Sequence, residues 1–295
     1  MQYDVIVVGG GPAGLSAATI LGRARRRVVI FDDGKYRNEA SRAVHGFLTR
    51  DGIDPAELRR IAREQLTRYD VEYRCLHINA ARIVDAGFEV TLEDGSVLQS
   101  RKLLLATGVT DLIPDVEGMH RFYGAGVFHC PYCDGWELRD RPLAAFGRSA
   151  AGLAASLKTW SDNVILCTDG PIALKPEEGQ RLDRLRIPVY RQKIARLEGG
   201  DALDQIVFTD GVVVPCRGIF FNTGQRQRCD LAATLGCAFT KKGAVRTGKL
   251  EGTNVRGLFV AGDASKDVQF AVVAAAEGAK AAIAINSALQ LEDAE

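Results

Sequence analysis

The stretch YDVIVVGGGPAG, residues 3–14, decides the fold of this 295-residue chain. Residues 3–8 form a short β-branched run, glycines follow, and an alanine-rich helix is expected over residues 13–22. A further apolar run over residues 28–31 completes a succession of strand, helix and strand. The sequence therefore predicts a βαβ unit at its start.

The glycines follow the spacing G-x-G-x-x-G, directly after a strand and at the start of a helix, which is the context that a dinucleotide-binding turn requires. The first glycine allows the tight turn, the second lets the backbone approach a pyrophosphate, and the third lets helix and strand pack closely. The helix N-terminus supplies amide donors and a positive dipole to the phosphates. Asp32, at the end of the second strand, is placed to accept from a ribose hydroxyl. The predicted cofactor-binding residues of the turn are Gly9, Gly11, Pro12, Ala13 and Gly14.

The composition is that of a globular protein with about two domains of ordinary size. Hydrophobic residues make up 46% and charged residues 25%, and the formal net charge is +1. That near-neutral charge gives no support to a function on nucleic acid or on a membrane surface. No apolar stretch approaches the roughly 18 residues that span a bilayer, and the chain enters its first strand without a signal-peptide pattern. A cytoplasmic location is expected.

Seven cysteines are present, and two of them form the motif Cys130-Pro131-Tyr132-Cys133-Asp134. A C-x-x-C pair needs a second ligand pair to hold zinc, and none with suitable spacing exists, so no metal site is expected. A purely structural disulfide is uncommon in a cytoplasmic protein. The motif therefore predicts a redox-active disulfide. The other cysteines are expected to be small buried apolar residues: Cys75, Cys167, Cys216, Cys229 and Cys237.

The thiol pair lies at an expected helix start, where the two sulfurs can pair and the helix dipole lowers the pKa of one thiol. Asp134 is a candidate general acid and base for the exchanging thiol if burial raises its pKa, and helix N-terminal capping is its structural alternative. His45 and His129 are able to move protons at neutral pH, although a hydrogen-bonded structural role is the commoner one for a single histidine. Tyr132 and Trp136 are interpreted as packing residues around the pair.

A second βαβ unit is predicted from residue 142 onward, after alternating strands over residues 71–106. The first pattern then resumes toward the end of the chain. The economical inference is an outer domain of residues 1–112 and 243–295, interrupted by an inserted domain of residues 113–242 that carries the C-x-x-C pair. The expected fold class is α/β.

Two further segments resemble those of the two-dinucleotide-binding flavoproteins: LLLATG at residues 103–108 and GLFVAGDA at residues 257–264. In that family the aspartate of the second segment bonds the ribityl or phosphate region of FAD, which implies this role for Asp263. The helix over residues 270–289 would present its N-terminal dipole to the flavin. The resemblance implies FAD as the cofactor. It adds to the site Ala106, Thr107, Gly108, Gly262 and Asp263.

Together, the glycine fingerprint, these two segments and the C-x-x-C-D motif are similar to the low-molecular-weight thioredoxin reductases, over nearly the whole chain. The resemblance implies two Rossmann-like three-layer (ββα) dinucleotide-binding domains, the second inserted in the first, in a homodimer. It also implies that Cys133 lies near the flavin while Cys130 exchanges with the substrate.

The second domain departs from that pattern. Aligning G-x-G-x-x-A with residues 145–150 leaves the first glycine missing and places Phe146 so that it crowds the turn. Asp169 stands where a basic cluster would hold a 2′-phosphate, and its charge would repel that phosphate. The prediction is that NADPH is not used and that no nucleotide binds there, with NADH as the alternative.

Two subgroups of the superfamily share such a degenerate site. They are thioredoxin reductases fed by ferredoxin or reduced flavin, including deep-branching cyanobacterial forms, and dithiol oxidases of the gliotoxin and holomycin type. The Cys-Pro-aromatic-Cys sequence and the segment over residues 38–52 resemble both, and Asp134, where gliotoxin-type oxidases are expected to carry histidine, favours the reductase. The implied substrate is a thioredoxin-like protein or a small dithiol or disulfide, with an unidentified electron donor or acceptor. An oxygen-using dithiol oxidase and a flavin-binding module without turnover are the alternatives.

Overall fold

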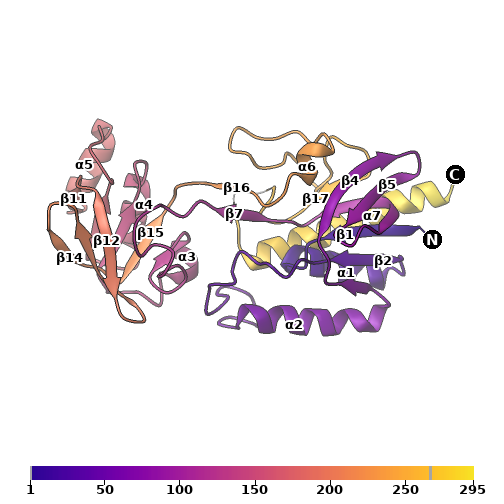
Figure 1. Cartoon of the computed structure of the whole chain (residues 1–295), viewed down its shortest axis with the longest axis horizontal. Helices are drawn as coiled ribbons and strands as arrows, with labels where there is room; N and C mark the ends of the chain where they lie inside the picture. The colour runs from indigo at the N-terminus through magenta and orange to yellow at the C-terminus, as the bar shows by residue number, and fades with distance from the viewer. Residues whose placement is uncertain (1, 266–267) are drawn as a thin grey trace. The chain divides into compact units, whose positions relative to one another are not determined.

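The computed structural model describes residues 2–265 and 268–295, which divide into two compact units (Figure 1). The first unit comprises Met1–Glu39, Gly46–Thr110 and Gln225–Glu295, and the second comprises Ala40–His45 and Asp111–Gly224. Along the chain, the second unit is therefore inserted in the first.

The first unit is built on a parallel sheet with the strand order β3-β2-β1-β6-β17. Its strands are β1 (Tyr3–Val8), β2 (Val28–Phe31), β3 (Glu72–Arg74), β6 (Val97–Leu105) and β17 (Leu258–Val260). The first part of β6 also pairs antiparallel with a hairpin of β4 (Ile78–Val84) and β5 (Gly87–Leu92). Because Val8 pairs with Leu105, β1 and β6 end side by side, and the turns that follow them meet at one sheet edge.

Alternating side chains of β1 divide the interior of this unit between two cores. Ile6 and Val8 belong to the core shared with the hairpin. Val5 and Val7 belong to the core shared with the helices α1 (Pro12–Arg23), α2 (Pro55–Leu66) and α7 (Ala271–Asp293). The unit therefore has three layers, formed by hairpin, sheet and helices.

Helices α1 and α2 start at residues that favour helix initiation. Both carry proline in the first turn, where a missing N–H costs little. Asp54 caps α2 by accepting from the backbone N–H groups of Ala56 and Glu57 at 2.8 and 2.9 Å. A 3-10 turn, Thr67–Tyr69, follows α2 directly.

By length and composition, helix α7 is long and apolar enough to cross a bilayer. This corrects the expectation that no apolar stretch of the chain reaches that length. Its apolar character comes largely from alanine, which also lets it approach α1 closely. A Cβ at Gly278 of α7 would lie 2.0 Å from the carbonyl oxygen of Ala13. The buried side of α7, including Ile285 and Leu289, belongs to the core between helices and sheet. We interpret α7 as a core helix of the first unit.

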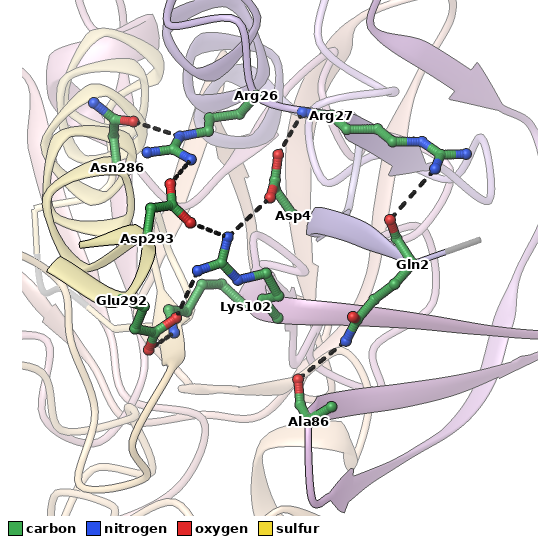
Figure 2. A network of polar contacts seen from close by, with 10 residues as sticks. Gln2, Asp4, Arg26, Arg27, Ala86, Lys102, Asn286, Glu292 and Asp293 are labelled. Carbon is green, nitrogen blue, oxygen red and sulfur yellow. Dashed lines mark hydrogen bonds and ion pairs between the residues drawn. The ribbon is translucent and has the colours of Figure 1, made fainter. Parts of the chain in front are cut away.

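A network of charges fixes the carboxyl end of α7 to β6 and to the turn before β2 (Figure 2). Asp293 accepts from Arg26 and from Arg101, in both cases at 2.6 Å. Glu292 accepts from Arg101 at 3.2 Å and from the buried Lys102. These bonds set the position of α7 along its axis, and with it the position of its other end beside the glycine turn.

The second unit repeats the layering of the first. Its parallel sheet has the order β11-β10-β9-β15-β8, and an antiparallel sheet of β12-β13-β14 shares a core with one face. Ala144 and Phe146 point into that core, whereas Leu143 and Ala145 point into a core shared with helices α4 and α5. Both units are therefore α/β, three-layer and Rossmann-like. The elements are β8 (Val127–Phe128), β9 (Leu143–Phe146), α4 (Ala151–Leu157), β10 (Val164–Cys167), α5 (Pro176–Arg184), β11 (Val189–Tyr190), β12 (Ile194–Gly199), β13 (Leu203–Phe208), β14 (Val213–Pro215) and β15 (Gly218–Phe221).

The first boundary lies between residues 110 and 111, close to the predicted 112, whereas the return to the first unit comes earlier than the predicted 243. Residues 225–242 belong to the first unit, where β16 (Gln225–Gln227) pairs with β7 (Val109–Asp111). Helix α6 (Leu231–Thr234) then places its apolar side chains in the core beside the hairpin. A four-residue helix carries no periodic apolar pattern, so no sequence signal indicated that this segment returns to the first unit.

Candidate functional site

The first βα turn forms a backbone cradle that requires glycine. Gly9 has a φ of +111°, and a Cβ there would lie 2.3 Å from the carbonyl oxygen of Ala106. A Cβ at Gly14 would lie 1.9 Å from the carbonyl oxygen of Gly9, so helix and strand approach closely only without a side chain. At Gly11, the N-cap of α1, a Cβ would meet nothing within 4 Å, and no side chain caps the helix. The first amides of α1 are therefore available to an anion.

Three segments far apart in the sequence meet at this cradle. A Cβ at Gly9 would also lie 3.3 Å from the backbone nitrogen of Thr107, in the segment after β6. Gly262, after β17, has a φ of +81°, and a Cβ there would lie 3.1 Å from the Cβ of Ala13. The N–H of Gly262 donates to the buried carboxylate of Glu277 at 2.8 Å. Glu277, which the sequence analysis missed, is a single acidic residue inside an alanine-rich stretch, and that contrast was the available signal.

Asp263 is held by Arg37, a second residue that the sequence analysis did not single out. Nη1 of Arg37 donates to Oδ2 of Asp263 and to Oε1 of Gln269, both at 2.7 Å. The Arg37 side chain is largely buried. It joins the loop after β2 to the segment after β17, and so fixes the carboxylate that the resemblance assigns to FAD. One arginine in a polar loop is usually solvated, so no pattern in the sequence distinguished Arg37 from other surface arginines.

Asp32 lies directly after β2, as predicted from the sequence, and is buried. Its Oδ2 accepts from the hydroxyl groups of Tyr36 and Tyr73, and its Oδ1 accepts from the N–H of Gly34 at 3.2 Å. Burial and the bonds to Asp32 raise the pKa of both tyrosines, so they remain protonated donors. The carboxylate is therefore fixed by the protein, and its contact with a ribose stays a prediction.

The corresponding turn of the second unit follows β9, and the structure corrects its alignment. Gly147 has a φ of +125°, and its N–H donates to the carbonyl of Cys167 at the end of β10. The N–H of Gly9 donates in the same way to the carbonyl of Phe31 at the end of β2. Gly147 therefore occupies the first-glycine position, and the prediction that this glycine is missing was wrong. The second-glycine position is held by Ser149.

Phe146 does not crowd that turn, contrary to the prediction. It is the last residue of β9, and the alternation of the strand buries it in the core facing the antiparallel sheet. Asp169 lies two residues after β10 with a φ of +52°, and its Oδ1 accepts from the N–H of Ile194 at 3.1 Å. The turn after β9 therefore differs from the turn after β1 at Ser149. In addition, Asp169 lies close to the end of the neighbouring strand β10.

Cys130 and Cys133 form a disulfide, with their Cα atoms 5.3 Å apart, and both residues are partly exposed. Cys130 is the N-cap of α3 (Pro131–Asp134), a helix of four residues. One turn has only a small dipole, so the expected lowering of a thiol pKa by the helix finds little support. Of the other cysteines, which are free, the buried ones are Cys167, Cys216 and Cys237, whereas Cys75 is exposed, against expectation, and Cys229 is partly buried.

Asp134 follows Cys133 and is the last residue of α3. No side chain caps this helix, and Asp134 lies at its C-terminal end, so the capping alternative was wrong. Burial, and after it the carboxylate of Glu137, raises the pKa of Asp134 to about 7, while the charge of His45 acts in the opposite direction. A carboxyl group with this pKa can take up and release a proton near neutral pH, which general acid–base catalysis requires.

The two aromatic residues of the motif region lie on the surface, which corrects their interpretation as packing residues. Tyr132 is 71% exposed and Trp136 is 65% exposed. Tyr132 and Trp160 form an edge-to-face ring pair with their centroids 5.2 Å apart. Arg139 lies over the ring of Trp136 at 4.3 Å. Two exposed aromatic side chains therefore lie in and shortly after the C-x-x-C motif.

The two candidate histidines have acidic partners. Nδ1 of His129 lies 3.8 Å from Oδ2 of Asp111 and 3.4 Å from the hydroxyl of Tyr123, which itself donates to Asp111 at 3.0 Å. Nε2 of His45 lies 3.5 Å from Oε1 of Glu137. His129 thus has the hydrogen-bonded role common for histidine, whereas His45 lies in the electrostatic surroundings of Asp134.

Comparison with known proteins places this geometry in a family. Residues 3–278 match the family of pyridine nucleotide-disulphide oxidoreductases. The chain belongs to that family. Thioredoxin reductase tcpT of Claviceps purpurea is 34% identical, over 88% of this chain and 86% of its own. The crystal structure of HlmI has a TM-score of 0.96 at 33% identity, covering 99% of this chain and 94% of that one, and the oxidoreductase from Agrobacterium tumefaciens has 0.93 at 32%, covering 99% of both.

The similarity confirms a thioredoxin reductase-like flavoprotein disulfide oxidoreductase with two Rossmann-like domains. FAD is the cofactor of this family, and the first unit fits it, because the glycine cradle leaves open space at Gly11 and uncapped amides at the start of α1. When bound, FAD supplies two-electron oxidation and reduction. The residues that would hold it are Gly9, Gly11, Pro12, Ala13, Gly14, Asp32, Ala106, Thr107, Gly108, Gly262 and Asp263, with Arg37 and Glu277 supporting the last two.

Proposed function

We propose that this protein is an FAD-dependent thiol-disulfide oxidoreductase that passes electrons between flavin and the Cys130–Cys133 disulfide without using NADPH. The observation that carries the proposal is the partly exposed disulfide with an acid of pKa about 7 directly after its second cysteine. The substrate is a thioredoxin-like protein or a small dithiol or disulfide, and the protein acts in the cytoplasm as a homodimer.

The exchange step in the reductive direction starts with both cysteines as thiols. Cys130, as the thiolate, attacks one sulfur of the substrate disulfide, whose S–S bond breaks and releases the other sulfur as a thiolate. Cys133, as the thiolate, then attacks Cys130 in the mixed disulfide. The Cys130–Cys133 bond forms, and the second substrate sulfur leaves. Two electrons have passed to the substrate, and two protons from the enzyme thiols end on its sulfurs.

Asp134 is the group that moves these protons. Protonated, it can donate to a leaving thiolate, and ionised, it can accept from a thiol about to attack. With a pKa of about 7, both forms are populated near neutral pH. This supports a role in either direction of the exchange.

The absence of NADPH chemistry is supported by the second βα turn. Ser149 has a side chain at the position where a pyrophosphate must approach the backbone closely. The negative charge of Asp169 would repel the 2′-phosphate of NADPH. Reduced flavin or ferredoxin is then the proposed electron donor. The same exchange run in reverse, with oxygen as the final acceptor, is the second candidate, supported by the motif Cys-Pro-aromatic-Cys. Oxygen consumption on addition of dithiothreitol separates this dithiol oxidase from the reductase.

Paired cysteine variants test the proposal. Cys130→Ser leaves Cys133 unpaired, and a thiolate next to oxidised flavin should give a long-wavelength charge-transfer band. Cys133→Ser should lack the band, and both variants should lose turnover by roughly a thousandfold or more while they keep FAD. Full disulfide-reducing or thiol-oxidising activity in both variants would contradict the proposed function. A yellow protein without turnover in wild type would support the flavin-binding module instead.

A further inference from the structure

The segment Ala40–His45 lies between β2 and α2 in the sequence but belongs to the second unit. Its backbone packs closely on that unit, because a Cβ at Gly124 would lie 2.2 Å from the carbonyl oxygen of Ala40. Gly124 also has a φ of +80°, a conformation that favours glycine. The segment therefore has a defined place on the second unit, and His45 is its last residue.

The side chain of His45 is 24% exposed and faces the residues that follow the disulfide. Its Nε2 lies 3.5 Å from Oε1 of Glu137, whose side chain is 44% exposed. Glu137 follows Asp134 by three residues, and Asp134 follows Cys133 directly. The contact between His45 and Glu137 therefore lies in the short stretch that follows the disulfide, three residues after Asp134.

The two neighbours act on Asp134 with opposite signs. The negative charge of Glu137 raises the pKa of Asp134, and the positive charge of His45 lowers it. They are the charged groups that act on Asp134 in the part of the chain that the structure describes.

We propose that His45 is a positioning residue which, as the ion-pair partner of Glu137, sets the pH range in which Asp134 holds a proton beside Cys133, and thereby the pH range of disulfide exchange. The inference deepens the proposed function and rests on it. His45 does not itself touch the reacting sulfurs in this account. It acts through Glu137 and Asp134.

A titration of the Asp134 carboxyl by infrared spectroscopy tests the proposal without turnover. The protonated carboxyl band that disappears in Asp134→Asn identifies the group. In His45→Gln, a positive charge is lost, so the midpoint should rise by about 0.5–1 pH unit. In Glu137→Gln, a negative charge is lost, so the midpoint should fall by a similar amount. A merely structural role would not move the two midpoints in opposite directions.

The pH profile of exchange supplies the second measurement. Enzyme prereduced with dithionite is mixed with oxidised lipoamide, and the pH midpoint of the rate should shift in each variant as the infrared midpoint does. His77→Gln is the matched control, because Nδ1 of His77 lies 3.6 Å from Asp33 in the first unit, and it should leave both midpoints unchanged.

The outcomes separate this inference from the proposed function. The role of His45 is overturned if the infrared midpoints of the two variants stay at the wild-type value or move in the same direction. It is also overturned if the infrared midpoints move and the pH profile of the exchange rate does not. Wild-type enzyme that does not exchange with lipoamide or any thioredoxin-like disulfide overturns the proposed function, whereas the infrared midpoints still report on His45. The role is established if the infrared midpoints of the two variants shift in opposite directions and the pH midpoint of the exchange rate shifts with them.

Discussion

The two βα turns of this protein have the same backbone start and different chemistry after it. In both, a glycine with positive φ follows the first strand and donates its N–H to the end of the second strand. After Gly9 come two more glycines and a proline that opens the 12-residue α1. After Gly147 come Arg148 and Ser149, both exposed, and then the seven-residue α4 with Ala150 as its N-cap.

The difference shows that the fold and the ligand site have separate requirements. The first glycine is needed for the chain to turn, so the second unit keeps it. The second glycine is needed only for a pyrophosphate to approach the backbone, and the second unit has Ser149 in its place. The second unit therefore has a Rossmann-like architecture without the second glycine, and we propose that its chemistry lies at the disulfide and Asp134.

The largest expected effect comes from filling the close contact in the first turn. In Gly14→Ala the new Cβ would lie 1.9 Å from the carbonyl oxygen of Gly9, and we expect about 2–4 kcal/mol of destabilisation with loss of FAD. Gly152→Ala, the matched change in the second turn, meets nothing within 4 Å and should stabilise α4 by roughly 0.5–1 kcal/mol. Urea unfolding and FAD content measure both. Equal effects would break the comparison.

A smaller and more selective effect is expected from giving the first turn the serine of the second. Gly11→Ser adds a side chain to open space at an N-cap, so the apoprotein should unfold as wild type or gain a few tenths of a kcal/mol. FAD should bind at least about tenfold more weakly, because the pyrophosphate needs that space. Titration of apoprotein with FAD measures this, and Ser149→Gly is the control that should leave FAD affinity unchanged. Wild-type affinity in Gly11→Ser would remove the second glycine from the pyrophosphate site.

Asp134 in the second unit should make the free energy of unfolding depend on pH. The pKa of Asp134 is raised from 3.8 to about 7, so its ionisation disfavours the folded state, and the wild type loses stability as pH rises through this window. Asp134→Asn does not ionise. The two proteins should unfold alike near pH 4, and the variant should be more stable at pH 8 by on the order of 1–3 kcal/mol. A constant difference across this range would show that burial does not perturb the carboxyl.

Sequence reasoning predicted the elements that repeat a simple pattern. The β-branched run at residues 3–8 and the glycine spacing were sufficient for β1, α1 and the cradle between them, and the βαβ unit after residue 142 was also predicted. The resemblance supplied FAD and the three-layer fold, which the comparisons confirm. The disulfide pairing of Cys130 and Cys133 followed from their spacing.

Contacts between distant segments could not be read from such patterns. The ion pair of Arg37 with Asp263 joins residues 226 positions apart, and the place of His45 beside Glu137 depends on a loop that leaves its own unit. The alignment of the second turn failed because Phe146 was taken for a turn residue. Only the end of β9 shows that its side chain belongs to a core.

We propose that electrons pass between FAD and the Cys130–Cys133 pair and that NADPH does not supply them. Anaerobic titration of the purified protein tests it most directly, with the visible flavin absorbance and the thiols at Cys130 and Cys133 followed together. Dithionite or a reduced flavin should bleach the flavin and convert the disulfide to two thiols, whereas NADPH and NADH should do neither at a comparable rate. Rapid, stoichiometric bleaching by NADPH with formation of both thiols would contradict the account.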